Sequence, residues 1–439
     1  MGERPHPVPG VCVLHPDIKS SSRRGIYAYA LSLIAGLRQA GHRTALATDL
    51  ASEDIARDAL AIPRAVAHPQ ARKVSAVAAL PAYLRLQWAN QPPALSHPMD
   101  KHLPLEASNA YLSEVDEFIN QPDFYEICRL AGNKPLLPAV SLDFMARLGC
   151  KVAFTATPMA VKGTAVSVIQ TVHDLIILNE TVHDLNRSKF KRRLQACIRH
   201  ADVIVAVSEY TRTEILQRYP QAAQRVVVAY QPLPADPLTV QHSTDPVRQA
   251  AVLQRFGLEA GRFIFFVGAV EERKNVARLI RAYQQSRASH DCQLVIAGSL
   301  DEGYAKAEGI DHLLKPGAKG PIQYIGRISD VDKLCLLRQA RLFAFPSITE
   351  GFGLPALEAQ SMGCPVLTSN TSALREVVAA SAGLVNDPTD VDEITAVLDT
   401  LVLDDDLNTR LAREGLVNAQ RFHRDHFAER LRHIVRMVS

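Results

Sequence analysis

Apolar and polar residues follow one another along this chain in a rhythm that predicts parallel β-sheets covered by helices. GVCVLHP is a short apolar run, and after the polar turn SSSRRG the segment IYAYALSLIAGLRQAGH repeats apolar residues at helical spacing until Gly41. RTALATDL is typical of the next strand. Strand, helix and strand in this order indicate a βαβ unit, so we expect an α/β protein.

The same rhythm returns after a less regular stretch. Residues 51–150 contain proline clusters and mixed helical patterns, and we interpret them as a partly helical excursion inside the first domain. From residue 151 strands and helices alternate again, and AVSVIQTV and DVIVAVS are mostly apolar, as expected for strands buried on both faces. The proline-rich segment 231–246 lacks periodicity and is interpreted as a linker, after which a second α/β series begins.

These patterns predict two Rossmann-like domains. At 439 residues the chain is too long for one ordinary core. We place the first domain at 1–235, the second at 236–420, and a terminal helix at 421–439. Because ligands bind at the strand-to-helix loops of parallel sheets, we expect the two domains to share a cleft.

Composition narrows the class of protein. Hydrophobic residues make up 47% and charged residues 22% of the chain, as in soluble globular proteins, and a net charge of +3 gives no reason to expect nucleic-acid binding. Seven scattered cysteines without a C-x-x-C pair indicate buried thiols in a reducing compartment. Since neither a signal peptide nor an apolar run of about 18 residues is visible, we expect a cytoplasmic protein.

The segment LFAFPSITEGFGLPALEAQSMG holds the densest candidate chemistry. A strand run ends at Glu350, glycines follow in a turn, and Pro355 opens a helix whose free amides favour an anion such as phosphate. Glu358 comes eight positions after Glu350, in what we expect to be the first helical turn. Carboxylates beside a phosphate suit sugar hydroxyls. The alternative is that Glu358 is a capping charge and Glu350 a solvated loop acid.

A second segment, FFVGAVEERKN, places two cations in a strand-to-helix loop. The apolar run leads to Gly268, and Arg273 and Lys274 precede a helix that Asn275 is expected to cap. Adjacent cations in such a loop can neutralise a diphosphate. The alternative is a solvated basic dipeptide.

Together these segments resemble the retaining glycosyltransferases of the GT-B fold in family 4, also called glycosyl transferases group 1. Four segments in the family's order carry the resemblance: the loop at Gly25, Thr171–Leu175, Gly268–Asn275 and Pro346–Glu358. The pattern P-S-x-x-E-G-F-G-L-P-x-x-E is the family's signature. The resemblance implies two Rossmann-like domains facing each other across a cleft, with the C-terminal helix crossing back to the N-terminal, acceptor-binding domain.

The resemblance also implies roles for residues of the donor domain. Arg273 and Lys274 would hold the donor diphosphate, Glu350 the hydroxyls of the donor sugar, and Glu358 the ribose. We assign catalytic roles to four residues: His173, Arg273, Lys274 and Glu350. The other donor-site positions that match the family are Gly25, Gly268, Gly326, Arg327, Ile328, Phe352, Gly353 and Leu354.

The pentapeptide Thr-Val-His-Asp-Leu occurs twice, ten residues apart. The first copy follows a buried strand, so His173 and Asp174 are expected at the carboxyl edge of the sheet, and it matches the family's strand-end His-Asp. The resemblance implies that His173 reaches the donor sugar or the acceptor, and that Ser208 lies at the cleft edge. The second copy follows a polar break, where Thr181 or Asp184 would cap the next helix.

For the reaction, the resemblance implies transfer of a hexosyl unit with retention, from a nucleotide-diphosphate sugar to a glycan or lipid-linked glycan in cell-surface polysaccharide synthesis. The motif EGFGLP favours a mannosyl or rhamnosyl donor. The leaving phosphate assists deprotonation of the acceptor in this family, so neither a separate base nor a cofactor is expected. Alternatives are a nucleotide-sugar 2-epimerase on the same fold and a non-catalytic nucleotide-sugar-binding module.

Asp-x-Asp triplets begin at Asp330, Asp390 and Asp404, and such triplets hold a metal in another glycosyltransferase fold. Each lies at a helix start or in a polar turn, so we interpret them as helix caps and expect no metal.

Membrane contact is suggested by one basic segment, RSKFKRRLQACIRHA. Phe190, Leu194, Cys197 and Ile198 share one face of the helix it predicts, which could lie on an anionic membrane surface. The alternative is that this face packs on the sheet and the charges are solvated. For the basic C-terminal segment we expect packing on the first domain to account for the apolar residues.

Overall fold

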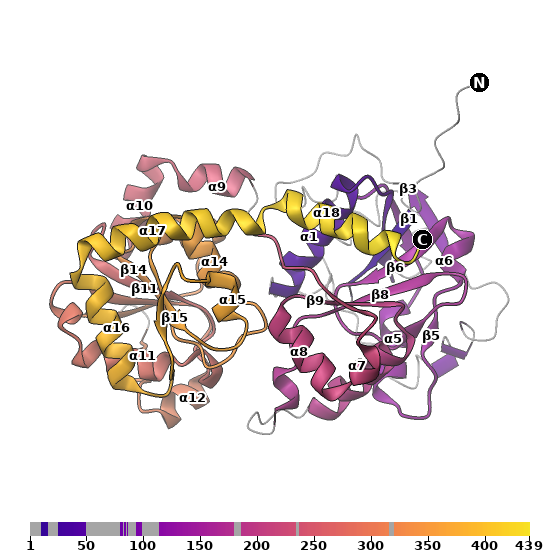
Figure 1. Cartoon of the computed structure of the whole chain (residues 1–439), viewed down its shortest axis with the longest axis horizontal. Coiled ribbons are helices and arrows are strands. Elements are labelled where there is room, and N and C mark those ends of the chain that lie inside the picture. The colour runs from indigo at the N-terminus through magenta and orange to yellow at the C-terminus, as the bar shows by residue number, and fades with distance from the viewer. Residues whose placement is uncertain are drawn as a thin grey trace. The chain divides into compact units, whose positions relative to one another are not determined.

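The computed structural model describes residues 10–15, 25–49, 80–81, 83–84, 86, 94–98, 114–179, 186–233, 237–315 and 320–439. The chain divides into two compact units (Figure 1). Unit 1 is Met1–Pro232 together with Arg424–Ser439, and unit 2 is Leu233–His423.

Unit 1 is built on a sheet whose described strands run in the order β10-β9-β8-β6-β1-β2-β4-β3. All neighbours are parallel except β3 and β4. The strands are β1 (Gly10–Leu14), β2 (Thr44–Thr48), β3 (Leu95–Pro98), β4 (Glu117–Asn120), β6 (Cys150–Thr155), β8 (Ser167–Val172), β9 (Val203–Ala206) and β10 (Val226–Val228), with a separate pair β5 (Val140–Ser141) and β7 (Val161–Lys162). The helices are α1 (Gly25–Gln39), α5 (Phe124–Asn133), α6 (Phe144–Arg147), α7 (Arg187–His200), α8 (Glu209–Arg218) and α18 (Arg424–Arg436).

Unit 2 is built on a parallel sheet in the order β13-β12-β11-β14-β15-β16. The strands are β11 (Phe263–Val267), β12 (Gln293–Ala297), β13 (Ile322–Gly326), β14 (Leu342–Phe345), β15 (Val366–Ser369) and β16 (Gly383–Val385). The helices are α9 (Pro237–Ser243), α10 (Pro246–Phe256), α11 (Val276–Gln285), α12 (Glu302–Ala307), α13 (Asp330–Gln339), α14 (Leu354–Ser361), α15 (Leu374–Val378), α16 (Val391–Leu403) and α17 (Asp405–Ala419).

Both sheets reverse their strand order next to their first strand. In unit 1 the chain adds β2 on one side of β1 and later β6 on the other, and in unit 2 it adds β12 and then β14 around β11 in the same way. Doubly wound sheets bind ligands at the carboxyl ends of the strands that flank such a reversal. The order therefore marks the ends of β1 and β6, and those of β11 and β14, as the places to look for sites.

The predicted α/β class is confirmed, because every strand and helix expected in residues 10–50, 151–230 and 262–369 is present. The first two strands lie inside the unit 1 sheet: β1 and β2 are buried over their whole length. In unit 2, Phe265, Phe343 and Phe345 pack ring to ring across β11 and β14.

The segment 231–246, interpreted as a linker without periodicity, contains a helix in its described part. Pro237–Ser243 is helix α9, and α10 begins at Pro246. Proline is favoured in the first turn of a helix, so the residue that suggested a linker opens a helix instead. The Oγ of Ser243 accepts a hydrogen bond from Arg338 on α13, which ties α9 to unit 2.

Within the irregular stretch 51–150, the structure describes short strands that the sequence did not indicate. The strand β4 has only two apolar residues of four, because it begins with Glu117 and ends with Asn120. The Glu117 carboxylate is buried, and it accepts hydrogen bonds from Arg43 at 2.8 Å and Ser96 at 2.6 Å. A polar strand with internal partners lacks the hydrophobic pattern by which strands are predicted.

The basic helix α7 uses its apolar face inside the protein. Leu194, Cys197 and Ile198 are buried in a cluster with residues of β8 and β9, and Phe190 packs against that cluster. Arg192 donates to the Asn133 carbonyl at 2.7 Å. The packing alternative is therefore confirmed, and the apolar face of this helix is not available to a membrane. No helix in the described parts of the chain is long and apolar enough to span a bilayer.

The C-terminal helix α18 lies along α1 within unit 1 (Figure 1). Gly36 provides the room: a Cβ there would lie 2.9 Å from Leu431 and 3.1 Å from Phe427. All seven cysteines are buried and unpaired by disulfides, as predicted.

Candidate active site

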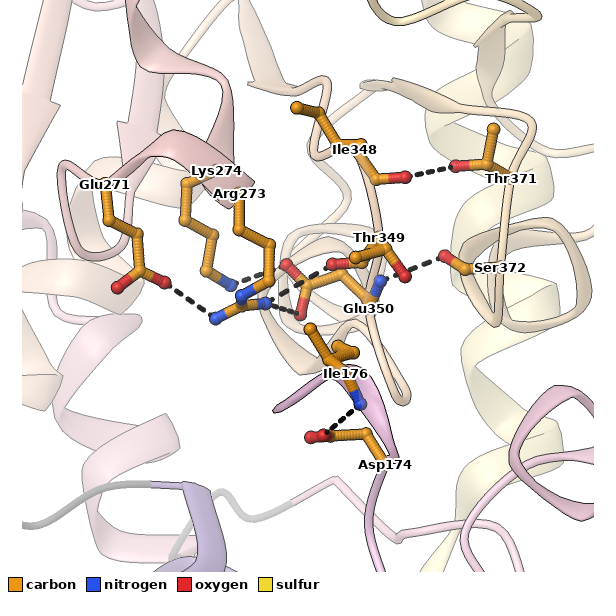
Figure 2. Close-up of polar contacts among 10 residues, drawn as sticks. All are labelled: Asp174, Ile176, Glu271, Arg273, Lys274, Ile348, Thr349, Glu350, Thr371 and Ser372. Carbon is orange, nitrogen blue, oxygen red and sulfur yellow. Dashed lines mark hydrogen bonds and ion pairs between the residues drawn. The ribbon is translucent and has the colours of Figure 1, made fainter. Parts of the chain in front are cut away.

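Three loops of unit 2 meet at the carboxyl edge of β11, β14 and β15 (Figure 2). The Ile348 amide donates to the Arg273 carbonyl at 2.9 Å, which joins the loop after β14 to the loop after β11. Thr371 and Ser372, in the loop after β15, bond to the Ile348 carbonyl at 3.1 Å and the Glu350 amide at 3.0 Å. The loops that carry the two motifs are thus locked together.

The charged residues of the two motifs pair directly with one another. Lys274 Nζ donates to Glu350 Oε1 at 2.6 Å, and Arg273 Nη1 donates to Glu350 Oε2 at 2.9 Å (Figure 2). Arg273 Nη2 donates to Glu271 at 2.8 Å, and Lys274 Nζ lies 4.7 Å from the centre of the Phe345 ring. Since Glu350 is only 7% exposed, the alternative of a solvated loop acid is wrong.

The Glu350 carboxylate is ionised at neutral pH. Burial alone would raise the pKa of the Glu350 carboxyl, but Lys274 and Arg273 hold that pKa below its ordinary value. Burial lowers the pKa of the Lys274 ammonium, although Glu350 opposes this shift. Two cations therefore converge on one carboxylate at the strand-order reversal of unit 2.

Asn275 holds the loops in place and does not cap a helix through its side chain. It precedes α11 with a left-handed φ of 62° and makes no side-chain capping bond. Its buried Nδ2 donates to the carbonyls of Pro346 at 2.9 Å and Pro388 at 2.6 Å, and its Oδ1 accepts from Arg278. The predicted capping role is thus wrong, and the side chain joins the loops after β11 and β14.

Glu358 is the fifth residue of α14, one turn later than predicted, so the capping-charge alternative is wrong. The helix starts at Leu354, with Pro355 in second place. The Glu358 carboxylate is 7% exposed and accepts a hydrogen bond from Lys333 on α13 at 2.8 Å. Nothing in the sequence pattern distinguishes Lys333 from a solvated lysine.

Two of the four predicted site glycines have a positive backbone φ. Gly353 precedes α14 with φ 99° and Gly326 ends β13 with φ 68°, a region that favours glycine. Gly268 follows β11, and its amide donates to the Ala297 carbonyl at 2.9 Å. Gly25 is the exposed first residue of α1, and the loop before it lies outside the described residues.

The remaining donor-site candidates frame the same edge of unit 2. Phe352 is 4% exposed and meets Phe422 edge to face, and Leu354 opens α14. Arg327 is exposed, while Ile328 packs against the core.

In unit 1, both ring nitrogens of His173 are hydrogen-bonded. Nε2 donates to the Ala156 carbonyl at 2.9 Å, and Nδ1 accepts from the Gln231 amide at 3.1 Å. The ring packs edge to face with that of Tyr29, with 4.8 Å between ring centres. Burial lowers the pKa of His173, although the Ala156 carbonyl and Asp174 oppose this, so the imidazole is neutral with its proton on Nε2.

Asp174 and Ser208 shape the backbone around His173. The Asp174 carboxylate accepts from the Ile176 amide at 3.1 Å, closing a tight turn (Figure 2). Ser208 is fully buried and caps α8 by accepting from the Thr211 amide, and the Thr211 hydroxyl donates to the His173 carbonyl at 3.0 Å. The second pentapeptide, with its predicted caps Thr181 and Asp184, lies outside the described residues.

The Asp-x-Asp triplets lie at helix starts, as expected. Asp390 and Asp404 cap α16 and α17 by accepting backbone N–H bonds, whereas Ser329, just before Asp330, caps α13. Among the described residues there is no group of three or more His, Cys, Asp or Glu side chains able to hold a metal ion.

Two family sequence models match this chain. "Glycosyltransferase Family 4" matches residues 143–236 and "Glycosyl transferases group 1" matches residues 254–416, together more than half of the chain. The chain belongs to glycosyltransferase family 4, the glycosyl transferases of group 1. The second of these family matches contains the loop with Arg273 and Lys274 and the whole segment from Pro346 to Glu358.

Two similar proteins are named as mannosyltransferases of Escherichia coli. O-antigen chain mannosyltransferase B of Escherichia coli is 33% identical over 257 residues, which is 58% of this chain and 66% of that protein. Serotype-specific mannosyltransferase WbdA of E. coli is 27% identical over 260 residues, 57% of this chain and 31% of the relative. The chain thus matches less than two thirds of the length of either.

The fold is that of GT-B glycosyltransferases. The structure of Anabaena HepE in complex with UDP and glucose superposes with a TM-score of 0.63 at 15% identity, covering 98% of this chain and 99% of that one. This similarity extends through both units and confirms the predicted fold class.

Proposed function

We propose that this chain is a retaining, metal-independent glycosyltransferase that uses a nucleotide-diphosphate sugar to extend a glycan or lipid-linked glycan of a cell-surface polysaccharide. A mannosyl unit is favoured over a rhamnosyl unit, because the two relatives from E. coli are both named mannosyltransferases. Unit 2 would bind the donor and unit 1 the acceptor.

The observation that carries the proposal is the convergence of Arg273, Lys274 and Glu350 at the strand-order reversal of unit 2. A diphosphate offers several oxygens to two cations that now share one carboxylate. Binding of the donor would therefore draw both cations onto the diphosphate. The Glu350 oxygens released in this exchange would accept hydrogen bonds from hydroxyls of the donor sugar.

The same residues account for the chemistry proposed. The bond between the anomeric carbon and the diphosphate oxygen breaks, and Arg273 and Lys274 stabilise the charge on the leaving group. The acceptor oxygen bonds to the anomeric carbon from the face that the diphosphate leaves. Its proton passes to the leaving phosphate oxygen, so no protein base is needed.

His173 is better suited to binding than to proton transfer. Its Nε2 proton is held by Ala156 and its Nδ1 lone pair by Gln231, so the ring can meet a substrate hydroxyl only by exchanging one of these partners. We therefore assign His173 to binding of the donor sugar or the acceptor.

The proposal is tested by incubating the protein with labelled UDP-, GDP- and dTDP-sugars and a panel of glycan acceptors. We expect transfer from a mannosyl donor, with an α-linked product identified by NMR, and no loss of rate in EDTA. Inversion at C2 of the free donor would identify an epimerase. Tight binding with neither hydrolysis nor transfer would identify a non-catalytic module.

Site variants test the assignment of residues. Arg273→Ala and Lys274→Ala should each lower kcat/KM about 100- to 1000-fold, as expected for loss of a group that stabilises transition-state charge. His173→Ala should also lower it strongly. Two control variants should retain normal rates. Arg281→Ala removes an ion pair to Glu308 from α11, the helix that follows Lys274. His183→Ala changes the histidine of the second pentapeptide. Near-normal transfer by both cation variants would refute the assignment.

A further inference from the structure

Lys333 contacts Glu358, the carboxylate for which the family resemblance implies binding of the ribose. It lies on α13, the helix that follows β13, and its Nζ is 2.8 Å from Glu358 Oε1 and 3.4 Å from Asp330. The Lys333 side chain is 17% exposed and that of Glu358 is 9% exposed. Burial alone would lower the pKa of Lys333, but the two carboxylates raise it above its ordinary value, so the lysine carries its positive charge.

The pair leaves one carboxylate oxygen available. Lys333 bonds to Oε1 of Glu358, and no residue that the structure describes donates a hydrogen bond to Oε2. A carboxylate oxygen can accept more than one hydrogen bond, so Oε2 can bind neighbouring hydroxyls of a sugar. A lysine suits this arrangement because its ammonium is a point charge, whereas an arginine fork tends to occupy both oxygens.

We propose that Lys333 is a positioning residue for the nucleotide: it fixes Glu358 through Oε1, so that Oε2 is presented to the 2′- and 3′-hydroxyls of the ribose. This inference rests on the proposed function, since it takes Glu358 to bind the ribose of the donor. It also favours donors built on ribose, such as GDP- and UDP-sugars, over dTDP-sugars, which lack the 2′-hydroxyl.

The test is calorimetric titration of the full chain with GDP, UDP, dTDP and the 2′,3′-dideoxy forms of GDP and UDP. The wild-type protein should bind GDP or UDP about tenfold more tightly than the dideoxy form, because hydrogen bonds to a charged group are lost. Lys333→Met should weaken binding of the ribonucleotide about tenfold and leave the affinity for the dideoxy form unchanged. A lysine that only stabilised the fold would not make this distinction.

Two further variants keep the test decisive if Lys333→Met folds poorly. Glu358→Gln should show the same selective loss of affinity for the ribonucleotide. The double variant Lys333→Met with Glu358→Gln leaves no buried charge without a partner, so it should bind the ribonucleotide no more weakly than either single variant. Arg255→Met is the matched control, because it removes a 2.6 Å ion pair to Asp332 from the same helix and leaves Glu358 untouched. Its affinities should equal those of the wild type.

Other results would overturn the inference in separable ways. If Lys333→Met weakened binding of ribo- and dideoxynucleotides equally, the role of Lys333 alone would be refuted. The same conclusion would follow if Glu358→Gln weakened ribonucleotide binding and Lys333→Met did not. Binding of dTDP more tightly than GDP and UDP would refute the ribose preference. Failure of the wild-type protein to bind any of these nucleotides would refute the proposed function as well.

Discussion

Two histidines at the same sheet edge of unit 1 have opposite hydrogen-bonding states. His173, after β8, is bonded through both ring nitrogens. His15, after β1, is fully buried, and neither ring nitrogen has a hydrogen-bond partner in the described structure. Burial lowers the pKa of His15 to about 4, with the nearby His173 adding to the shift. The consequence is a pH-dependent cost to stability.

We predict that His15 destabilises unit 1 as the pH falls from 6.5 toward 4. In this range the unfolded chain binds a proton at this residue and the folded chain does not, so unfolding is favoured by acid. Between pH 7 and pH 5 the loss should be about 2 kcal/mol. His15→Leu should remove this part of the pH dependence in urea unfolding measured at both pH values. Identical pH dependence in variant and wild type would show that folding does not shift the pKa of His15.

At the scale of elements, hydrophobic patterning predicted the strands and helices whose buried residues are apolar. The segments of β9 and β11 consist of apolar residues only, and their positions agree with the structure. Patterning failed for β4, where the buried Glu117 carboxylate accepts hydrogen bonds from Arg43 and Ser96 through one of its oxygens. A polar residue whose partners are distant in sequence leaves no local signal.

The same limit applies to the candidate site. The motifs identified Arg273, Lys274 and Glu350 because these residues are close in sequence to glycine turns and strand ends. Lys333 was missed, since its partner Glu358 is 25 positions away and the lysine lies in an ordinary polar helix. Asn275 was recognised as part of the motif, but its action on two other loops depends on how β11 and β14 pair.

Asn275 gives a prediction about how these loops are held. Asn275→Ala should destabilise unit 2 by about 3 kcal/mol, because two carbonyls lose their buried donor and alanine disfavours the left-handed conformation. Asn275→Gly should be about 1 kcal/mol more stable than Asn275→Ala, since glycine accepts a positive φ. Asn386→Ala, at an exposed asparagine, is the control and should change stability little. Calorimetric unfolding measures all three, and wild-type stability of Asn275→Ala would contradict the argument.

At the scale of the whole molecule, unit 1 is built from two segments of the chain, and unit 2 lies between them in the sequence. Unit 1 contains both ends of the described chain, because α18 follows all of unit 2 and packs on α1. Phe427, Leu431 and Ile434 are all buried there. A helix that closes the core of the first unit from the far end of the sequence makes the stability of unit 1 depend on residues beyond unit 2.

Leu431→Ala tests this dependence. The leucine is fully buried against α1, so its truncation should leave a cavity costing about 3 kcal/mol. That loss should lower the melting temperature of unit 1 by about 9 °C. The transition that Asn275→Ala lowers marks unit 2, and Leu431→Ala should leave that transition in place. Leu403→Ala, at a leucine of α16 that is 43% exposed, should move neither transition appreciably. If Leu431→Ala instead lowered the unit 2 transition, α18 would belong to that unit in solution.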